Sequence, residues 1–302
     1  MPILGRATRQ GRPPDALHGE RAARASSLFP SCANPLCLTS WLHLWRNRQV
    51  PVFEGGWSCS EECTRERIAV SVRHEMDGQQ PEPVEHHHRV PLGLLMLSEG
   101  WISQAQLKAA LRAQKAAGHG RLGSWLIRDA HIEERLVTRA LSLQWNCPVF
   151  SMQGPPDQGL GSIAPRLLVE AFGILPIRVA GGKVLYVGFE DRIDRCVMFA
   201  IERITGLRVE AGLVDTSEFV RAHSTLLAGS SFAKATLIEA VDANAMIQAL
   251  TQLVERAKPA DARLVRVHDC YWMRMWHGVR SAEVPFHRVG IEDVICSIGS
   301  TN

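Results

Sequence analysis

Apolar positions recur at helical spacing in two neighbouring stretches of the chain, residues 91–114 and 121–144. Each stretch opens with Leu-Gly and further apolar residues, is interrupted near its middle, and continues as an amphipathic segment that ends in glutamine. In the first stretch this segment, QLKAALRAQ, has the i, i+3, i+4 spacing of a helix, and Ser103 with Gln106 predicts a capping box at its start. Each stretch therefore predicts two helices joined by a turn, and together they predict a helical tandem-repeat subdomain over residues 91–150.

Residues 155–228 combine short apolar runs with longer helical patterns. The runs ILPIRVA and KVLYVGF flank a Gly-Gly pair and predict a β-hairpin. A short helix that ends at Gly173 precedes the hairpin, and a helix that Gly206 stops follows it. A third strand, LRVEAGLV, and a helix that begins at Thr216 complete a predicted α/β subdomain with the order α-β-β-α-β-α.

The last stretch, residues 235–299, predicts a small α+β tail. After a loop, DANAMIQALTQLVERA has helical periodicity, ARLVRVHD and YWMRMWHG read as strands, and a final strand and helix follow. Tyr271, Trp272 and Trp276 lie near Arg274 and could stack on a ligand or a partner. Their alternation along the strand favours packing on the final helix of the tail.

Two segments lack a periodic apolar pattern. Residues 1–30 are rich in Arg, Gly and Pro, which predicts a disordered basic tail; a nucleic-acid-binding arm is the alternative interpretation. Residues 77–90 are polar, contain prolines and include a run of three histidines, so we expect a solvated linker there.

Four cysteines give residues 31–76 a distinct chemistry. They are Cys32, Cys37, Cys59 and Cys63. Two short-spaced pairs about twenty residues apart are typical of a tetrahedral zinc site, and four thiolates leave no open position, so a small structural zinc module is predicted. Ser58 and Glu61 predict a helix cap that places Cys63 on the first turn of a helix. The alternative is that the four cysteines are buried independently of one another.

Composition and charge narrow the class of protein. The chain has 302 residues, 46% of them hydrophobic, and a net charge of +3 with a pI near 8.5. This weak basic excess does not by itself indicate nucleic-acid binding. No apolar run approaches the ~20 residues of a membrane span, and the N-terminus lacks the apolar core of a signal peptide. We therefore expect an α+β multidomain protein in the cytoplasm, with reduced thiols and no direct membrane insertion.

Recognisable catalytic motifs are missing from the sequence. No G-x-x-x-x-G-K-[ST] stretch is present to hold nucleotide phosphates, and no nucleophile–base set can be named. Glu190, Asp191 and Asp194 form a small acidic group, for which turn and helix N-terminal roles are the simpler explanation. Cys147 and Cys196 lie among apolar neighbours and are predicted core residues. The sequence therefore favours a protein that is not an enzyme.

The repeated pattern Arg-Leu-Gly-x-x-Leu-Ile…Gly-x-Ile…Leu…Gln resembles the N-terminal domain of type II secretion and type IV pilus assembly ATPases of the GspE and MshE kind. The resemblance covers residues 91–228 well and residues 229–298 loosely, and the ATPase motor is missing. The second copy matches at Arg121, Leu122, Gly123, Leu126, Ile127, Ile132, Val137, Leu141 and Gln144. The first copy matches at Leu92, Gly93, Met96, Leu97, Gly100, Ile102, Leu107, Leu111 and Gln114.

In the MshE-type domain, two tandem motifs of this form bind cyclic di-GMP. The resemblance therefore implies a ligand site at Leu92, Gly93, Gln114, Arg121, Leu122, Gly123 and Gln144. This sequence departs from the motif at Pro91, where the motif has arginine, and at Ala130, where it has glycine. Proline has no side-chain donor for a phosphate or a guanine. The alternative is therefore a helical scaffold that has lost the ligand.

The resemblance implies an adaptor or sensor for a secretion or pilus machine, with a partner protein or a cyclic dinucleotide as its ligand. The alternative function is a nucleic-acid-associated regulator that uses the zinc module and the basic tail. Its candidate contacts are Arg46, Arg48, Arg65, Arg67 and Arg73. The acidic residues that dilute their positive field are Glu54, Glu61, Glu62 and Glu66. Nucleic acid is therefore the less favoured partner.

Overall fold

The structure, a computed structural model, describes residues 31–37, 50–78, 90–152, 154, 158–229, 232–278 and 290–299. The chain is mixed α+β, and its described part contains a two-stranded, a three-stranded and a four-stranded sheet. No helix among these residues is both long and apolar enough to cross a membrane. The predicted tail at 1–30, residues 79–89 of the predicted linker, and Arg46 and Arg48 lie outside the described residues.

Helices form where the repeated stretches predict them, and we call residues 92–145 the helical unit. Its helices are α2 (Leu92–Ser98), α3 (Gln104–Ala117), α4 (Leu122–Ala130) and α5 (Glu134–Trp145). The capping box of α3 is confirmed, because Ser103 Oγ accepts the Gln106 N–H at 3.2 Å and Gln106 Oε1 accepts the Ser103 N–H at 2.8 Å. Met96 of the first copy and Leu126 of the second are fully buried in one shared core.

The turn between the two helices differs between the copies. In the first copy, Gly100 has left-handed backbone with a φ of 70°, which glycine adopts without strain. In the second copy, Ala130 occupies the corresponding position and remains helical, and His131 takes the left-handed conformation instead, with a φ of 53°. The change from glycine to alanine therefore accompanies a longer α4 and a turn displaced by one residue.

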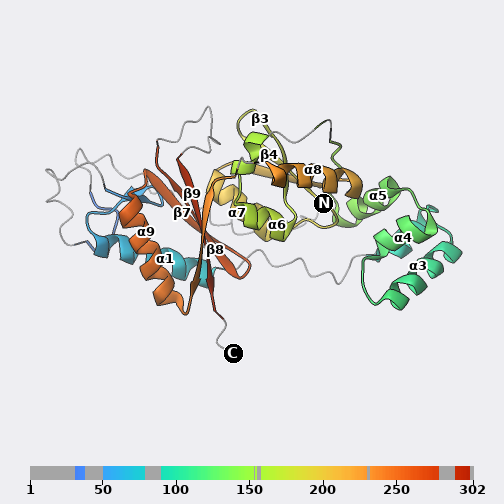
Figure 1. The fold of residues 1–302 in the computed structure, drawn as a ribbon, viewed down its shortest axis with the longest axis horizontal. Helices are drawn as coiled ribbons and strands as arrows, with labels where there is room; N and C mark the ends of the chain where they lie inside the picture. The colour runs from blue at the N-terminus through green and yellow to red at the C-terminus, as the bar shows by residue number, and fades with distance from the viewer. Residues whose placement is uncertain are drawn as a thin grey trace, which may run out of the picture.

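Residues 158–229 form what we call the central unit, and its elements follow the predicted order. They are η2 (Gln158–Ser162), α6 (Arg166–Phe172), β3 (Leu175–Ala180), β4 (Val184–Phe189), α7 (Arg195–Thr205), β5 (Arg208–Leu213) and α8 (Thr216–Ala228). The strand order is β3-β4-β5, with β4 antiparallel to β3 and parallel to β5. Alternate residues of β4, Leu185, Val187 and Phe189, are buried in a core shared with α6, α7 and α8 (Figure 1).

We call the four strands that follow the C-terminal sheet. They are β6 (Lys234–Ala240), β7 (Asp261–Val267), β8 (Cys270–Trp276) and β9 (Ile291–Ile298), in the order β6-β9-β8-β7, and α9 (Ala243–Ala257) follows β6. The loop predicted before this helix is wrong, because β6 occupies that position. As an edge strand with mostly exposed side chains, β6 lacks the alternation of a half-buried strand. Among the described residues no helix follows β9.

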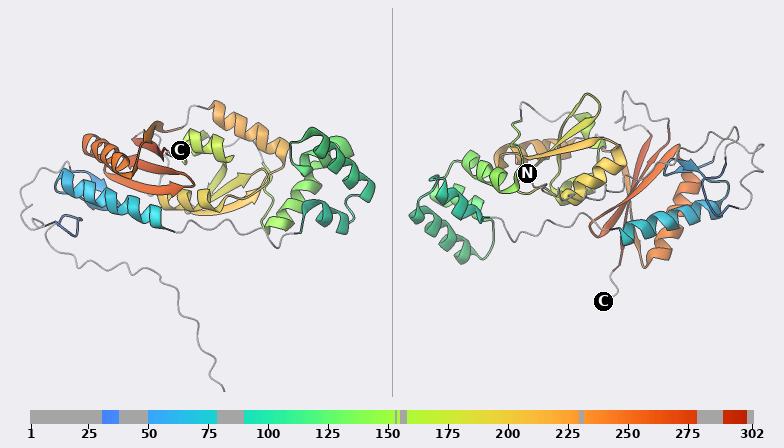
Figure 2. Two further views of the ribbon diagram at one scale, coloured as in Figure 1. Left: turned by 90° about the horizontal axis from the view of Figure 1, so that it is seen from below. Right: turned by 180° about the vertical axis from the view of Figure 1, so that it is seen from behind.

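The N-terminal segment packs on one face of the C-terminal sheet (Figures 1 and 2). β1 (Val52–Phe53) and β2 (Gly56–Trp57) form a hairpin, and α1 (Glu61–Asp77) lies beside α9. Ile68 and Val72 of α1 share a buried cluster with Leu250 of α9 and Met273 of β8. Segments from the two ends of the described chain therefore build one core.

The opposite face of the C-terminal sheet rests on the central unit. Trp272, Arg274 and Trp276 alternate along β8, and the two tryptophans belong to the core of the central unit. Arg274, only 2% exposed, pairs with Asp293 of β9 at 2.7 and 2.8 Å and donates to the Ile163 carbonyl at 2.9 Å. The aromatic group near Arg274 is therefore core, and Trp272 packs against the central unit rather than on a final helix.

We expect Asp293→Ala to lower the free energy of unfolding by about 3–5 kcal/mol, because Arg274 would remain buried without its counter-ion. The matched control is Glu210→Ala, which removes the partner of Arg208 from an exposed pair and should cost less than about 1 kcal/mol. Denaturant unfolding followed by circular dichroism measures both variants. Equal, small losses would contradict the importance of the buried pair.

Candidate functional site

The first motif copy makes close contact with the second at Gly93, near the start of α2. A Cβ atom on Gly93 would lie 2.6 Å from Leu107 Cδ1 of its own copy and 3.2 Å from Leu122 Cδ2 of the other copy. Contacts below 3.0 Å are not tolerated by a Cβ atom without movement of the neighbour. Glycine at this position therefore allows α2 to pack closely on α3 of its own copy and against α4 of the other copy.

The second copy repeats this contact at Gly123. A Cβ atom there would lie 2.8 Å from Val137 Cγ1 and 3.7 Å from Leu92 Cδ2. In the alignment of the copies, Val137 is the counterpart of Leu107 and Leu92 is the counterpart of Leu122. An approximate twofold relation therefore links the two copies. The predicted ligand residues around its centre are Leu92, Gly93, Leu122 and Gly123.

The glutamines that end the two motifs obey the same relation. Gln114 donates from Nε2 to the carbonyl of Gly120, directly before the second copy, at 2.8 Å. Gln144 donates from Nε2 to the carbonyl of Val90, directly before the first copy, also at 2.8 Å. Each glutamine thus fixes the backbone at the start of the other copy, and its amide oxygen is left to accept a further hydrogen bond.

Arg121, the one arginine at a motif start, reaches out of the helical unit. It is the N-cap residue of α4, and its side chain is 60% exposed. Nη1 lies 3.0 Å from Asp191 Oδ2 and 3.6 Å from Glu190 Oε2, two carboxylates directly after β4. Two members of the predicted acidic group therefore pair with the motif arginine, which the sequence did not indicate. The third, Asp194, accepts the Val197 N–H and caps α7 as predicted.

The four cysteines of the predicted zinc module converge in space. All four sulfurs lie within 4.8 Å of one another. Cys59 Sγ is 3.5 Å from Cys37 Sγ and 3.6 Å from Cys63 Sγ. Around a tetrahedral zinc ion with Zn–S bonds of ~2.3 Å, neighbouring sulfurs would be about 3.8 Å apart. Together with Cys32, these residues could therefore hold a metal ion, and independent burial of the four is ruled out as an explanation.

Local backbone contacts build this cysteine cluster. Ala33 donates to the Trp57 carbonyl at 2.9 Å, and a Cβ atom on Gly56 would lie 2.5 Å from Ala33 Cβ, so glycine lets the first cysteine loop approach the hairpin. The α1 cap is Ser60, whose Oγ accepts the Cys63 N–H at 3.3 Å, and the predicted cap at Ser58 is wrong. Cys63 nevertheless lies on the first turn of α1.

Arg67, a candidate nucleic-acid contact, has a structural role. Its guanidinium donates to the carbonyls of Phe53 and Gly56, and so joins α1 to the hairpin. Arg73 Nε donates to the Ala69 carbonyl of its own helix at 3.1 Å. Both contacts direct these arginines along the protein surface rather than away from it, which weakens the case for a nucleic-acid interface on α1.

Burial raises the thiol pKa of three cysteines outside the cluster, and Cys147, a predicted core residue, is only partly buried against the core. Burial raises the pKa of Cys270 to about 11 and that of Cys296 to about 12. Cys196 is buried as predicted, and burial raises the pKa of its thiol as well. His268 lies nearby, but its Nε2 is paired with Asp194 at 2.8 Å, and its backbone N–H is the group that contacts Cys196 Sγ. The contact that His268 makes with this sulfur is therefore through its main chain, and its ring Nε2 faces a carboxylate.

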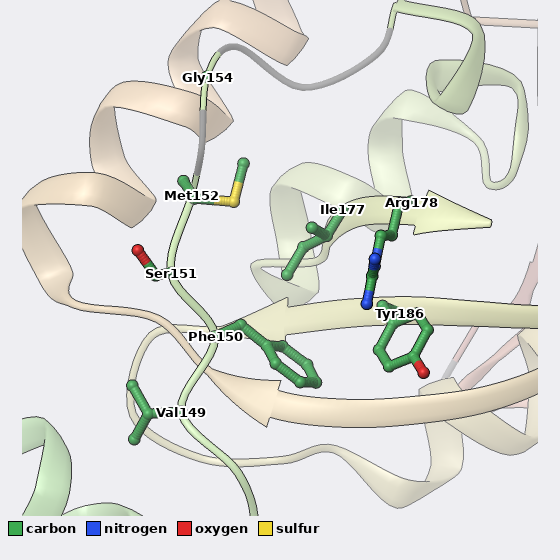
Figure 3. A pocket seen from close by; sticks show the side chains of 8 residues that line it. All are labelled: Val149, Phe150, Ser151, Met152, Gly154, Ile177, Arg178 and Tyr186. Atoms are coloured by element: carbon green, nitrogen blue, oxygen red, sulfur yellow. The ribbon is translucent and has the colours of Figure 1, made fainter. Parts of the chain in front are cut away.

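A pocket of about 450 Å³ lies beside β3 and β4 of the central unit (Figure 3). The Arg178 guanidinium lies 4.6 Å from the Tyr186 ring centre, and Phe150 meets the same ring edge-on at 5.7 Å. Phe150 fits here because Gly212 has no Cβ atom, which would lie 2.6 Å from the Phe150 ring. None of the predicted ligand residues lines this pocket.

Comparison with known proteins finds solved structures that are similar to part of this chain. A structure of MshE with cdg is 28% identical, with a TM-score of 0.36, over 45% of this chain and 98% of that chain. A structure of the N-terminal domain of XpsE is 17% identical, with a TM-score of 0.34, over 48% of this chain and 97% of that one. No family model and no curated protein matches the chain. With TM-scores this low, a function has to be argued from this chain's own residues and contacts.

Gly93→Ala and Gly123→Ala are each expected to destabilise the protein by about 1–3 kcal/mol, because the added methyl group would overlap Leu107 in the first copy and Val137 in the second. Gly278→Ala is the matched control, since its Cβ would have no heavy atom within 4 Å. Thermal unfolding measures the three variants. A loss at only one of the two motif glycines would contradict the approximate twofold relation.

Proposed function

We propose that this chain is a non-catalytic adaptor or sensor related to the N-terminal domain of type II secretion and type IV pilus ATPases. In this proposal, the helical unit binds cyclic di-GMP. The approximate twofold relation of the two motif copies carries the proposal. Cyclic di-GMP is itself built from two equal halves, so a receptor made of two equivalent helical hairpins can contact both halves with equivalent groups.

The chemistry of the motif residues supports an anionic ligand. Arg121 is exposed and carries a planar fork of donors that matches phosphate or guanine. Leu92 and Leu122 offer apolar contact near the twofold centre, and Gln114 and Gln144 retain amide oxygens as acceptors. Pro91 supplies no counterpart to Arg121, so we expect the two halves of the ligand to be held unequally.

The same proposal holds that the chain has no enzymatic activity. The sequence has no phosphate-binding loop, and burial raises the pKa of the Cys196 thiol, which lies near His268 and Asp194. The helical unit instead exposes several leucines, which are suited to contact with a partner protein. They are Leu94, Leu111 and Leu143. A secretion or pilus machinery component is the partner class that the resemblance implies.

The cysteine cluster is proposed to hold one structural zinc ion. Burial and the neighbouring thiols raise the pKa of Cys59, so a bound cation would be needed to hold these sulfurs as thiolates. Thr64, one residue after Cys63, donates to Glu255 of α9 at 2.5 Å. The metal would therefore fix the start of α1 where it packs on α9.

Isothermal titration calorimetry of the full chain with cyclic di-GMP tests the ligand. We expect binding to the wild type, and a loss of at least tenfold in affinity for Arg121→Ala, because a charge-assisted contact contributes about 1.5–3 kcal/mol. Arg135→Ala removes an exposed arginine of α5 that pairs with Glu133, and should leave the affinity within about twofold. No heat with the wild type at high micromolar ligand would remove the sensor function and leave the adaptor.

Metal analysis of the purified full chain is expected to find about one zinc ion per chain. Cys59→Ser combined with Cys63→Ser should abolish the bound zinc and lower the unfolding temperature, since α1 would lose its anchor. Cys147→Ser, outside the cluster, should retain the metal. Zinc-free wild-type protein, or equal zinc content in all variants, would contradict the metal site.

A further inference from the structure

The ion pairs of Arg121 connect the motif to a different unit of the protein. Arg121 belongs to the helical unit, whereas Glu190 and Asp191 follow β4 of the central unit. We call these two residues the acidic pair. Both carboxylates contact the same nitrogen, Nη1, which is one of the donors available for recognition of a phosphate. The residue best suited to bind an anionic ligand is therefore already held by two internal anions.

The helical unit is anchored unevenly on the central unit. At α5, Leu141 and Trp145 pack against the core of the central unit, and Glu134 Oε1 accepts the Ser217 N–H at 2.6 Å. Through α4, the unit reaches the central unit with the Arg121 side chain. Figure 1 shows α5 next to α8, with α3 and α4 farther out. Loss of the Arg121 contact would thus release the α4 side while α5 remains attached.

The balance of charges makes the acidic pair a competitor for the ligand. A phosphate bound at Arg121 would lie close to the two carboxylates, and like charges at this distance repel each other. The pair is only weakly bound, because Arg121 is well exposed and exposed ion pairs are weak. A ligand phosphate that approaches the Arg121 guanidinium can therefore displace the acidic pair.

We propose that Glu190 and Asp191 gate the motif: they occupy Arg121 in the ligand-free protein, and the anionic ligand must displace them. This inference rests on the proposed function, since it concerns the same site. Binding at the motif and contact between α4 and the β4–α7 loop are then alternatives. Coupling between two binding events is reciprocal. If the contact lowers the affinity for the ligand, the bound ligand therefore weakens the contact by the same factor. The binding event is thereby reported to the central unit.

Calorimetry with cyclic di-GMP on the double variant Glu190→Gln/Asp191→Asn tests the gate in the full chain. We expect the dissociation constant to fall by about three- to tenfold relative to the wild type, because Arg121 is released and two repelling charges are removed. The matched control is Glu170→Gln/Glu210→Gln, which removes the same charge from pairs with Arg166 and Arg208. We expect the control to change the affinity by less than about twofold.

The outcomes separate the gate from the proposed function. Binding by the wild type with an unchanged or weaker affinity in the gate variant would overturn the gate and leave the ligand site standing. An equal gain in the control would also overturn it, because net charge alone would then explain the effect. Binding by none of the proteins at high micromolar ligand would overturn cyclic di-GMP binding and the gate with it, and would leave only the adaptor function.

Amide hydrogen exchange of the wild type adds a direct view of the contact. When cyclic di-GMP is added, exchange in residues 190–194 should become faster, while exchange at the start of α4 should become slower. In the gate variant, the same ligand should leave the exchange of residues 190–194 unchanged. Slower or unchanged exchange of residues 190–194 in the wild type on ligand binding would contradict release of the acidic pair.

Discussion

Asp293 holds the C-terminal sheet against the central unit. Its carboxylate accepts from Trp272 Nε1 and from two nitrogens of Arg274, and Arg274 in turn donates to the backbone of Ile163. A sheet that is apolar on both faces must be covered twice to keep water out. The central unit covers one face through this buried pair, and α1 with α9 covers the other. The positions of the cysteine cluster and of the helical unit both follow from that arrangement.

The helical unit combines a symmetric scaffold with an asymmetric charge. Gly93 and Gly123 permit the same close approach in both copies. The glutamine that ends each copy donates a hydrogen bond to the backbone just before the other copy. Arg121 has no partner of its kind, because Pro91 stands at the equivalent position. One arginine then serves two purposes, since it is the motif's cation and also the contact to Glu190 and Asp191. Coupling between ligand and subdomain contact follows from this double use.

Local patterns predicted the elements with strong periodicity. The helices of both copies, the hairpin of the central unit and the convergence of the four cysteines could be predicted because spacing within one segment sets each of them. Errors arose where the local signal was ambiguous. Ser58 and Ser60 both precede an acidic first turn, and only the backbone geometry selects Ser60. β6 was missed because an edge strand with exposed side chains has no apolar alternation.

The sequence by itself determined which residues repeat, which cysteines can share an ion, and which motif arginine is present. These properties depend on residue type and on spacing along the chain, which can be read directly from the sequence. Only the tertiary structure decided that α1 packs on α9, that Arg274 is buried against Asp293, and that Arg121 meets the acidic pair. Such contacts join residues far apart in the chain, and their partners are selected by the summed burial of whole faces, for which no local pattern carries a signal.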